Sequence, residues 1–155
     1  MFEENRKLAR LFREDLWNRG RLEIADEILT RDCRIDARVP FRTDFVVGPE
    51  AVKQLLSLYR ESFSDIHMEI QDVVAEGDRV VARWRGEGVH TGALFLPEAR
   101  GRRVSTSGID MFVIRGGQIA EGWIAWDVFG LLRSLGMPLP GDADWQPTGV
   151  NPPPA

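Results

Sequence analysis

The sequence predicts an α+β fold in which a curved, mixed or antiparallel sheet packs on N-terminal helices and forms a cone. Apolar residues recur at helical spacing up to about Phe63, and from Ile66 onward short alternating runs are separated by turns. Helices and strands segregated along the chain in this way are typical of α+β domains. A strongly curved sheet that covers helices on one face would enclose an opening suited to a small molecule.

Three helices are expected in the first part of the chain. Residues 3–17 carry apolar side chains at spacings of three and four, and Gly20 suits a left-handed cap. Residues 21–29 form a second, shorter amphipathic helix. The third helix spans 48–63 and has Pro49 in its first turn, where the missing N–H costs nothing.

The strands are placed by alternation and by turn residues, and Gly116-Gly117 gives the strongest hairpin signal because glycine accepts positive φ. A three-residue loop centred on Gly117 would pair Asp110 with Ile124, whereas a two-residue loop would pair Asp110 with Trp123. The expected strands are 33–39, 67–75, 79–88, 92–97, 103–115 and 118–127, with 41–47 as a loop or edge segment and a last helical turn at 129–135.

Length and composition favour one globular domain at 1–140 and a flexible C-terminal tail at 141–155. The net charge of −4 and the isoelectric point near 5.3 argue against a nucleic-acid partner. The single cysteine, Cys33, cannot form an internal disulfide, so a cytoplasmic location is expected. No apolar run reaches the length of a membrane helix, and no membrane partner is expected.

Asp110 is the main candidate for chemistry, because it is the one charged residue in the apolar run from Ile109 to Ile114. Strand alternation allows it to face either an internal pocket or the outer face of the sheet. His90 lies in a glycine-rich segment and could act as a base or fix that segment. Asp127 could be catalytic or could cap the last helix, and Asp36 lies on the first strand.

Three segments of the chain resemble the SnoaL-like polyketide cyclases of the nuclear transport factor two-like superfamily. They are GPEAVKQLLSLYRESFSDIHMEI, AEGDRVVARWRGEGVHTG and GIDMFVIRGGQIAEGWIAWDVFGLLRSLG, and the resemblance covers residues 5–138. It implies a cone-shaped α+β fold, a homodimer, no metal and no organic cofactor. It also implies an intramolecular aldol-type ring closure on a polyketide ester, in which an acid–base group moves a proton within an apolar pocket.

The resemblance assigns site residues position by position. The acid–base aspartate of the family aligns with Ile124, its histidine partner with Asp110, and a pocket asparagine with Ile35 or Asp36. Asp110 is therefore expected to be a relocated acid–base group on the opposite strand of the hairpin. The expected catalytic set is Asp110, His90, Asp127 and Asp36, and the expected substrate-binding set is Phe112, Ile124, Trp126, Trp84, Trp123 and Tyr59.

Two alternative functions remain open at the level of sequence. A non-catalytic small-molecule-binding member of the superfamily is favoured by the apolar residue at Ile124. An epoxide hydrolase or epoxide-opening cyclase would need the Asp-Arg-Asp set of limonene epoxide hydrolase. Here the corresponding triplet, Arg83-Trp84-Arg85, lacks the first aspartate, and Ile124 replaces the second.

Overall fold

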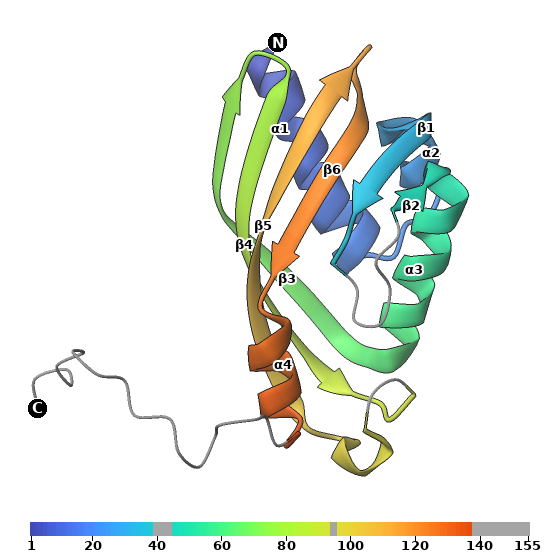
Figure 1. Cartoon of the computed structure of the whole chain (residues 1–155), viewed down its shortest axis with the longest axis vertical. Helices are drawn as coiled ribbons and strands as arrows, with labels where there is room; N and C mark the ends of the chain where they lie inside the picture. Colours follow the sequence, from blue (N-terminus) through green and yellow to red (C-terminus); the bar gives the residue numbers. More distant parts are fainter. Residues whose placement is uncertain (39–44, 94–95, 138–155) are drawn as a thin grey trace, which may run out of the picture.

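A computed structural model describes residues 1–38, 45–93 and 96–137, and the expected tail at 141–155 lies outside this range. Helical segments dominate the first part of the chain and long strands the second, which makes this an α+β fold (Figure 1). The elements are α1 (Phe2–Arg10), η1 (Leu11–Asn18), α2 (Ile24–Ile28), β1 (Leu29–Asp36), β2 (Val46–Val47), α3 (Gly48–Ser62), β3 (Phe63–Glu76), β4 (Arg79–His90), η2 (Pro97–Ala99), β5 (Arg103–Arg115), β6 (Gln118–Trp126) and α4 (Val128–Ser134).

The six described strands form one mixed sheet in the order β2-β1-β6-β5-β4-β3. Strands β3 to β6 are antiparallel neighbours, and β1 joins this meander in parallel with β6. The long strands curve around the helices, with α3 beside the short strands β1 and β2 and α4 at one end (Figure 1). The hairpin turn is the two-residue loop Gly116-Gly117, since Arg115 lies opposite Gln118. A register shift between Val113 and Ile114 then places Asp110 opposite Ile124, the pair expected for a three-residue loop.

The first helical segment has the expected extent but changes its winding midway. Residues 11–18 of η1 form a π-helix, in which N–H groups bond to carbonyls five residues back. The same spacing continues at the end, where the Arg19 N–H donates to the Glu14 carbonyl at 3.3 Å. This wide turn places Phe12 on the same side as Leu16 and Trp17, facing the sheet. The side chain of Arg13 is also buried on this side, with 1% exposure.

The concave face of the sheet holds two large aromatic side chains that lie over glycines of the neighbouring strand. A Cβ atom at Gly108 would be 2.5 Å from the Trp84 ring and 2.8 Å from the Ala125 carbonyl oxygen. A Cβ at Gly122 would be 2.9 Å from the Phe112 ring. These contacts are too close for any side chain, so glycine is required where the rings cross the adjacent strand.

The structure corrects two of the expected strands. The strand expected at 92–97 is wrong in its described part: β4 ends at His90 and residues 97–99 form a single 3₁₀ turn. Gly92 has φ +87°, and Pro97 has no N–H to offer a ladder, so an extended strand is disfavoured there. The first strand begins at Leu29 rather than residue 33 because α2 ends earlier than its apolar pattern suggests.

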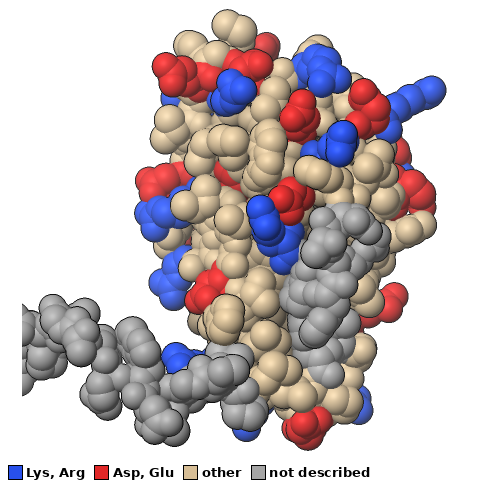
Figure 2. Space-filling view, viewed as in Figure 1, with Lys and Arg blue, Asp and Glu red and all other residues tan. Residues whose placement is uncertain are grey.

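Charged side chains are interspersed on the face drawn in Figure 2, with acidic and basic groups side by side. Several charged side chains of the described residues form ion pairs at the surface, such as Lys53 Nζ with Asp26 Oδ2 at 2.7 Å. Among the described residues, this face shows no continuous basic stripe of the kind that nucleic-acid binding requires. No helix in the described part of the chain is both long and apolar enough to span a membrane.

Replacing Gly108 with alanine should lower the free energy of unfolding by about 1–3 kcal/mol, because the new Cβ would displace the Trp84 ring. Gly86→Ala is the matched control: it lies on the same concave face, and its Cβ would meet Trp84 and Met68 only at ordinary distances of 3.4 and 3.5 Å. Urea denaturation of the two variants provides the measurement. Equal stability of the two variants would contradict the close packing at Gly108.

Candidate functional site

The helices and the concave face of the sheet enclose an apolar cavity. The space between its walls is about 870 Å³, including the part open to solvent at its mouth. A concave and mostly apolar cavity is typical of small-molecule sites. Its walls come from η1, β1, α3, the inward faces of β3 to β6, and α4. Arg13 is the one cationic side chain among the described residues of this lining.

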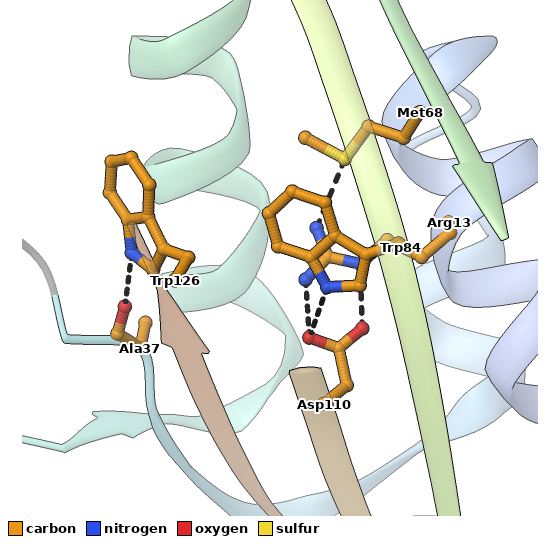
Figure 3. A network of polar contacts seen from close by, with 6 residues as sticks. All are labelled: Arg13, Ala37, Met68, Trp84, Asp110 and Trp126. Atoms are coloured by element: carbon orange, nitrogen blue, oxygen red, sulfur yellow. Dashed lines mark hydrogen bonds and ion pairs between the residues drawn. The ribbon is translucent and has the colours of Figure 1, made fainter. Parts of the chain in front are cut away.

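Arg13 is held by a buried ion pair with Asp110. Its Nε donates to Asp110 Oδ2 at 2.7 Å, and its Nη2 donates to Oδ1 at 2.5 Å, so the contact is bidentate. The two side chains are 2% and 0% exposed. Figure 3 shows the guanidinium group of η1 lying directly over the carboxylate on β5. Bidentate charge-assisted bonds of this kind fix both distance and orientation.

Trp84 and Met68 complete the surroundings of the guanidinium group (Figure 3). The Trp84 ring covers Arg13 with its centre 4.2 Å from Cζ, a cation–π contact. Trp84 Nε1 donates to Asp110 Oδ1 at 3.0 Å, and Arg13 Nη1 donates to Met68 Sδ at 3.1 Å. A guanidinium group has five N–H bonds. The bonds to Asp110 and Met68 use three of those on Arg13, and the side chain is 2% exposed.

Asp110 is fully buried and faces the interior, not the outer face of the sheet. It is not, however, among the residues that line the cavity. Its Oδ1 accepts two hydrogen bonds and its Oδ2 accepts one, so three of about four lone-pair positions are occupied. Trp84 and Arg13 both line the cavity and both bond to Asp110. A ligand in the cavity therefore meets Arg13 first and reaches Asp110 only past these two side chains.

His90 and Asp127 lie away from this pair. Ala82 pairs with Asp110, and His90 is eight residues further along β4, or about 26 Å at roughly 3.3 Å per residue. His90 is buried there against Phe63, with the two rings 5.4 Å apart. Asp127 is exposed and caps α4, where its Oδ1 accepts from the Gly130 N–H at 2.8 Å. The helix cap that the sequence allowed for Asp127 is thus observed.

Asp36 also lies outside the cavity. It is paired with Trp123 across β1 and β6, and its carboxylate forms an ion pair with Arg38 at 3.2 Å. Its chain neighbours Ile35 and Ala37 line the cavity instead. The structure therefore does not bring the four expected catalytic residues together into one cluster.

Four of the six expected substrate-binding residues line the cavity: Ile124, Trp126, Trp84 and Tyr59. Trp126 is fixed by a hydrogen bond from its Nε1 to the Ala37 carbonyl at 3.2 Å (Figure 3). Phe112 is fully buried and packs on Phe12 with ring centres 5.0 Å apart, outside the lining. Trp123 alternates with Ile124 along β6 and points to the other face of the sheet.

No group of three or more His, Cys, Asp and Glu side chains in the described ranges could hold a metal ion. Cys33 is buried in the core, and burial raises the pKa of its thiol. The polar or charged residues of the described lining are Arg13, Glu87, Thr106 and the aromatic residues with an N–H or O–H group, and Asp110 lies behind Arg13.

Comparison with known proteins identifies the family. A sequence model of the SnoaL-like polyketide cyclases matches residues 7–135. The chain belongs to the SnoaL-like polyketide cyclase family. No curated protein matched the sequence.

Solved structures agree with this family and with the nuclear transport factor two-like fold. TsrD from Streptomyces laurentii is 28% identical, with a TM-score of 0.73 over 87% of this chain and 96% of that chain. IdmH from Streptomyces antibioticus, described as a candidate polyketide cyclase, is 25% identical with a TM-score of 0.70 over 86% and 99%. An LEH-like epoxide hydrolase from M. tuberculosis shares the fold at 16% identity, with a TM-score of 0.66 over 86% and 90%.

Arg13 is the residue of the candidate site that sequence reasoning missed. It lies on the apolar stripe of the first helical segment together with Ala9, Phe12 and Leu16, at spacings of three and four. A charged residue on such a stripe needs a buried partner of opposite charge. Asp110, expected as an inward-facing carboxylate, is such a partner. Combining the two observations would have predicted the Arg13–Asp110 pair.

Replacing Asp110 with asparagine should lower the free energy of unfolding by about 3 kcal/mol, because it leaves the Arg13 charge buried without a counter-charge. Asp72→Asn is the matched control. Asp72 accepts from Arg83 Nε and Nη2 at the surface, where solvent screens the pair and the expected loss is below about 1 kcal/mol. Guanidinium denaturation of both variants tests the difference. Similar losses in the two proteins would show that the interior pair is not needed for stability.

Tyr59 is the only tyrosine in the sequence, so its ionisation can be followed by tyrosinate absorbance. Burial raises the pKa of Tyr59, because the charged form would lose its hydration. Above about pH 10 the unfolded chain releases this proton while the folded chain keeps it, so stability should fall as pH rises. We expect the absorbance to appear only together with alkaline unfolding seen by circular dichroism. A separate titration of the folded protein near pH 10 would contradict the burial of this hydroxyl.

Proposed function

We propose that this protein is a cofactor-free cyclase that closes a ring in a polyketide or related small molecule by acid–base catalysis. The observation that carries the proposal is the Arg13–Asp110 pair, which places a fixed guanidinium group in the wall of a largely apolar cavity. Membership of the SnoaL-like family supports the substrate class. An apolar cavity strengthens any electrostatic contact made within it, because little water screens the charges.

In an intramolecular aldol closure, a C–H bond beside a carbonyl loses its proton and negative charge develops on the enolate oxygen. The guanidinium group of Arg13 suits that oxygen, because it is pre-oriented by Asp110 and Trp84. The enolate carbon then attacks a second carbonyl of the same molecule. The new alkoxide takes up a proton, so that the reaction as a whole moves one proton from carbon to oxygen.

Asp110 is the proposed acceptor and donor of that proton. Its Oδ2 keeps one lone pair without a partner in the described residues. Because Asp110 lies behind Arg13 and Trp84, this role requires the reacting group to enter between them or a small rotation of the Trp84 ring. Ile124 faces Asp110 across the hairpin and provides the apolar surface at the position where the family acid is expected.

The non-catalytic binding protein is the rival function, and two observations favour it. Three of the lone pairs of Asp110 are already occupied, and Ile124 cannot transfer a proton. If the protein only binds its ligand, Arg13 orients a carbonyl group of the ligand and no reaction follows. The epoxide-opening alternative has less support, since Arg83 is exposed and pairs with Asp72 outside the cavity.

Asp110→Asn should lower turnover by about 100- to 10,000-fold, because the amide takes no proton. The assay would separate cyclised from linear isomers of a synthetic polyketide ester by chromatography with mass detection, alongside calorimetric binding. Asp36→Asn is the control, since Asp36 lies outside the cavity. Arg13→Gln should lower both turnover and affinity.

The outcomes separate the two functions. Full turnover by Asp110→Asn would remove Asp110 from catalysis. Binding without conversion by every protein, including the wild type, would favour the non-catalytic binding protein.

Dimerisation through the outer face of the sheet is a further proposal, compatible with either function. On that face Ile109 is 48% exposed, and Met111 and Trp123 are partly exposed.

A further inference from the structure

Three aromatic side chains from separate elements meet in the wall of the cavity. Trp17 on η1 lies 5.9 Å from Tyr59 on α3, and Tyr59 lies 6.1 Å from Trp126 at the end of β6, measured between ring centres. All three line the cavity. Trp17 also contacts Arg13, whose Cζ lies 5.3 Å from the indole ring centre. Trp17 therefore lies between the guanidinium group of Arg13 and the ring of Tyr59 and contacts both.

Two polar atoms of this aromatic group are buried without a partner. The Tyr59 hydroxyl and Trp17 Nε1 make no hydrogen bond within the described part of the chain. The Tyr59 side chain as a whole is 8% exposed. The other two cavity tryptophans are satisfied, since Trp84 donates to Asp110 and Trp126 donates to the Ala37 carbonyl. A buried polar group without a partner is uncommon in folded proteins, because its desolvation is not compensated.

We propose that the Tyr59 hydroxyl and the Trp17 indole N–H form a second polar anchor that binds oxygen acceptors of the ligand. The ligand class is a flat, largely apolar molecule with carbonyl or ether oxygens at two places, one near Arg13 and one near Tyr59. This inference rests on the proposed function in one respect, namely that the cavity is the substrate site. It adds that the end of the ligand near Tyr59 is bound by hydrogen bonds and does not react.

Both groups act as donors, which sets the selectivity. An indole N–H can only donate. Burial raises the pKa of Tyr59, so its hydroxyl keeps its proton across the pH range of ordinary assays. A site that offers buried donors discriminates strongly against a ligand without acceptors, because the donors then stay unpaired. The anchor would thus favour an oxygenated ring over the corresponding hydrocarbon.

The test uses a pair of probes that differ by one carbonyl group, 1-tetralone and tetralin, with affinities measured by calorimetry. The wild type should bind 1-tetralone about tenfold more tightly, as expected for one net hydrogen bond. Tyr59→Phe and Trp17→Phe should each reduce this preference to about two- to threefold or less, chiefly by weakening the binding of 1-tetralone. Trp126→Phe is the control: its N–H already bonds to Ala37, so both probes should weaken together and their ratio should persist.

Thermal unfolding provides a second measurement. Tyr59→Phe should melt at the same temperature as the wild type or higher, because it removes an uncompensated hydroxyl; a clearly lower value would indicate a structural partner and overturn the inference. A tenfold preference retained by both single variants would also overturn it. If the wild type binds neither probe, the anchor does not bind the proposed ligand class and the inference is overturned. Loss of turnover in Asp110→Asn bears on the proposed function alone.

Discussion

The buried ion pair between Arg13 and Asp110 is the contact on which the arrangement of helix and sheet depends. It joins residues 97 positions apart in sequence and fixes η1 against the middle of β5. Removing two charges from water is costly, and the cost is offset only where geometry and further hydrogen bonds are favourable. Here the bidentate contact, the Trp84 ring at 4.2 Å and the Trp84 N–H together meet that condition. The pair is neutral overall, so it can lie beside an apolar cavity.

Part of the space for the cavity is left because two bulky side chains of the concave face lie over glycines of adjacent strands. Trp84 and Phe112 cross onto Gly108 and Gly122 of the adjacent strands, and so occupy space within the sheet layer. Gly86 and Gly88 leave the corresponding part of β4 without side chains along the cavity wall. The interior of the cone is therefore open, although the surrounding core is closely packed. The shape of the cavity therefore depends on the glycines of the concave face as well as on its bulky side chains.

The fold could be predicted from sequence because its signals are local. Helical periodicity, the Gly116-Gly117 turn and the alternation along 103–127 each act over a few residues. They located the hairpin but not the register shift between Val113 and Ile114, which decides that Asp110 pairs with Ile124. The segment 92–97 failed because its apolar residues resemble a strand, while Gly92 and Pro97 impose a turn. The π-type winding of η1 has no comparably simple signal in the residue pattern.

The site was less predictable because it depends on contacts between distant elements. The inward direction of Asp110 could be foreseen as one of two alternatives, but its partner Arg13 lies on a helix 97 positions away. His90 and Asp127 were attractive as residue types, yet β4 carries His90 about 26 Å beyond the pair, at roughly 3.3 Å per residue. Chemistry inferred from residue type alone cannot locate a residue along a long, curved strand.

The distribution of indole rings has a practical consequence for finding the natural ligand. Of the five tryptophans in the sequence, Trp17, Trp84 and Trp126 line the cavity. Any molecule that enters must displace water or protein atoms from the faces of these rings. The intrinsic fluorescence of the unmodified protein is therefore a built-in reporter of occupancy, and extracts or compound collections can be screened for binding without a label, a substrate or an activity assay.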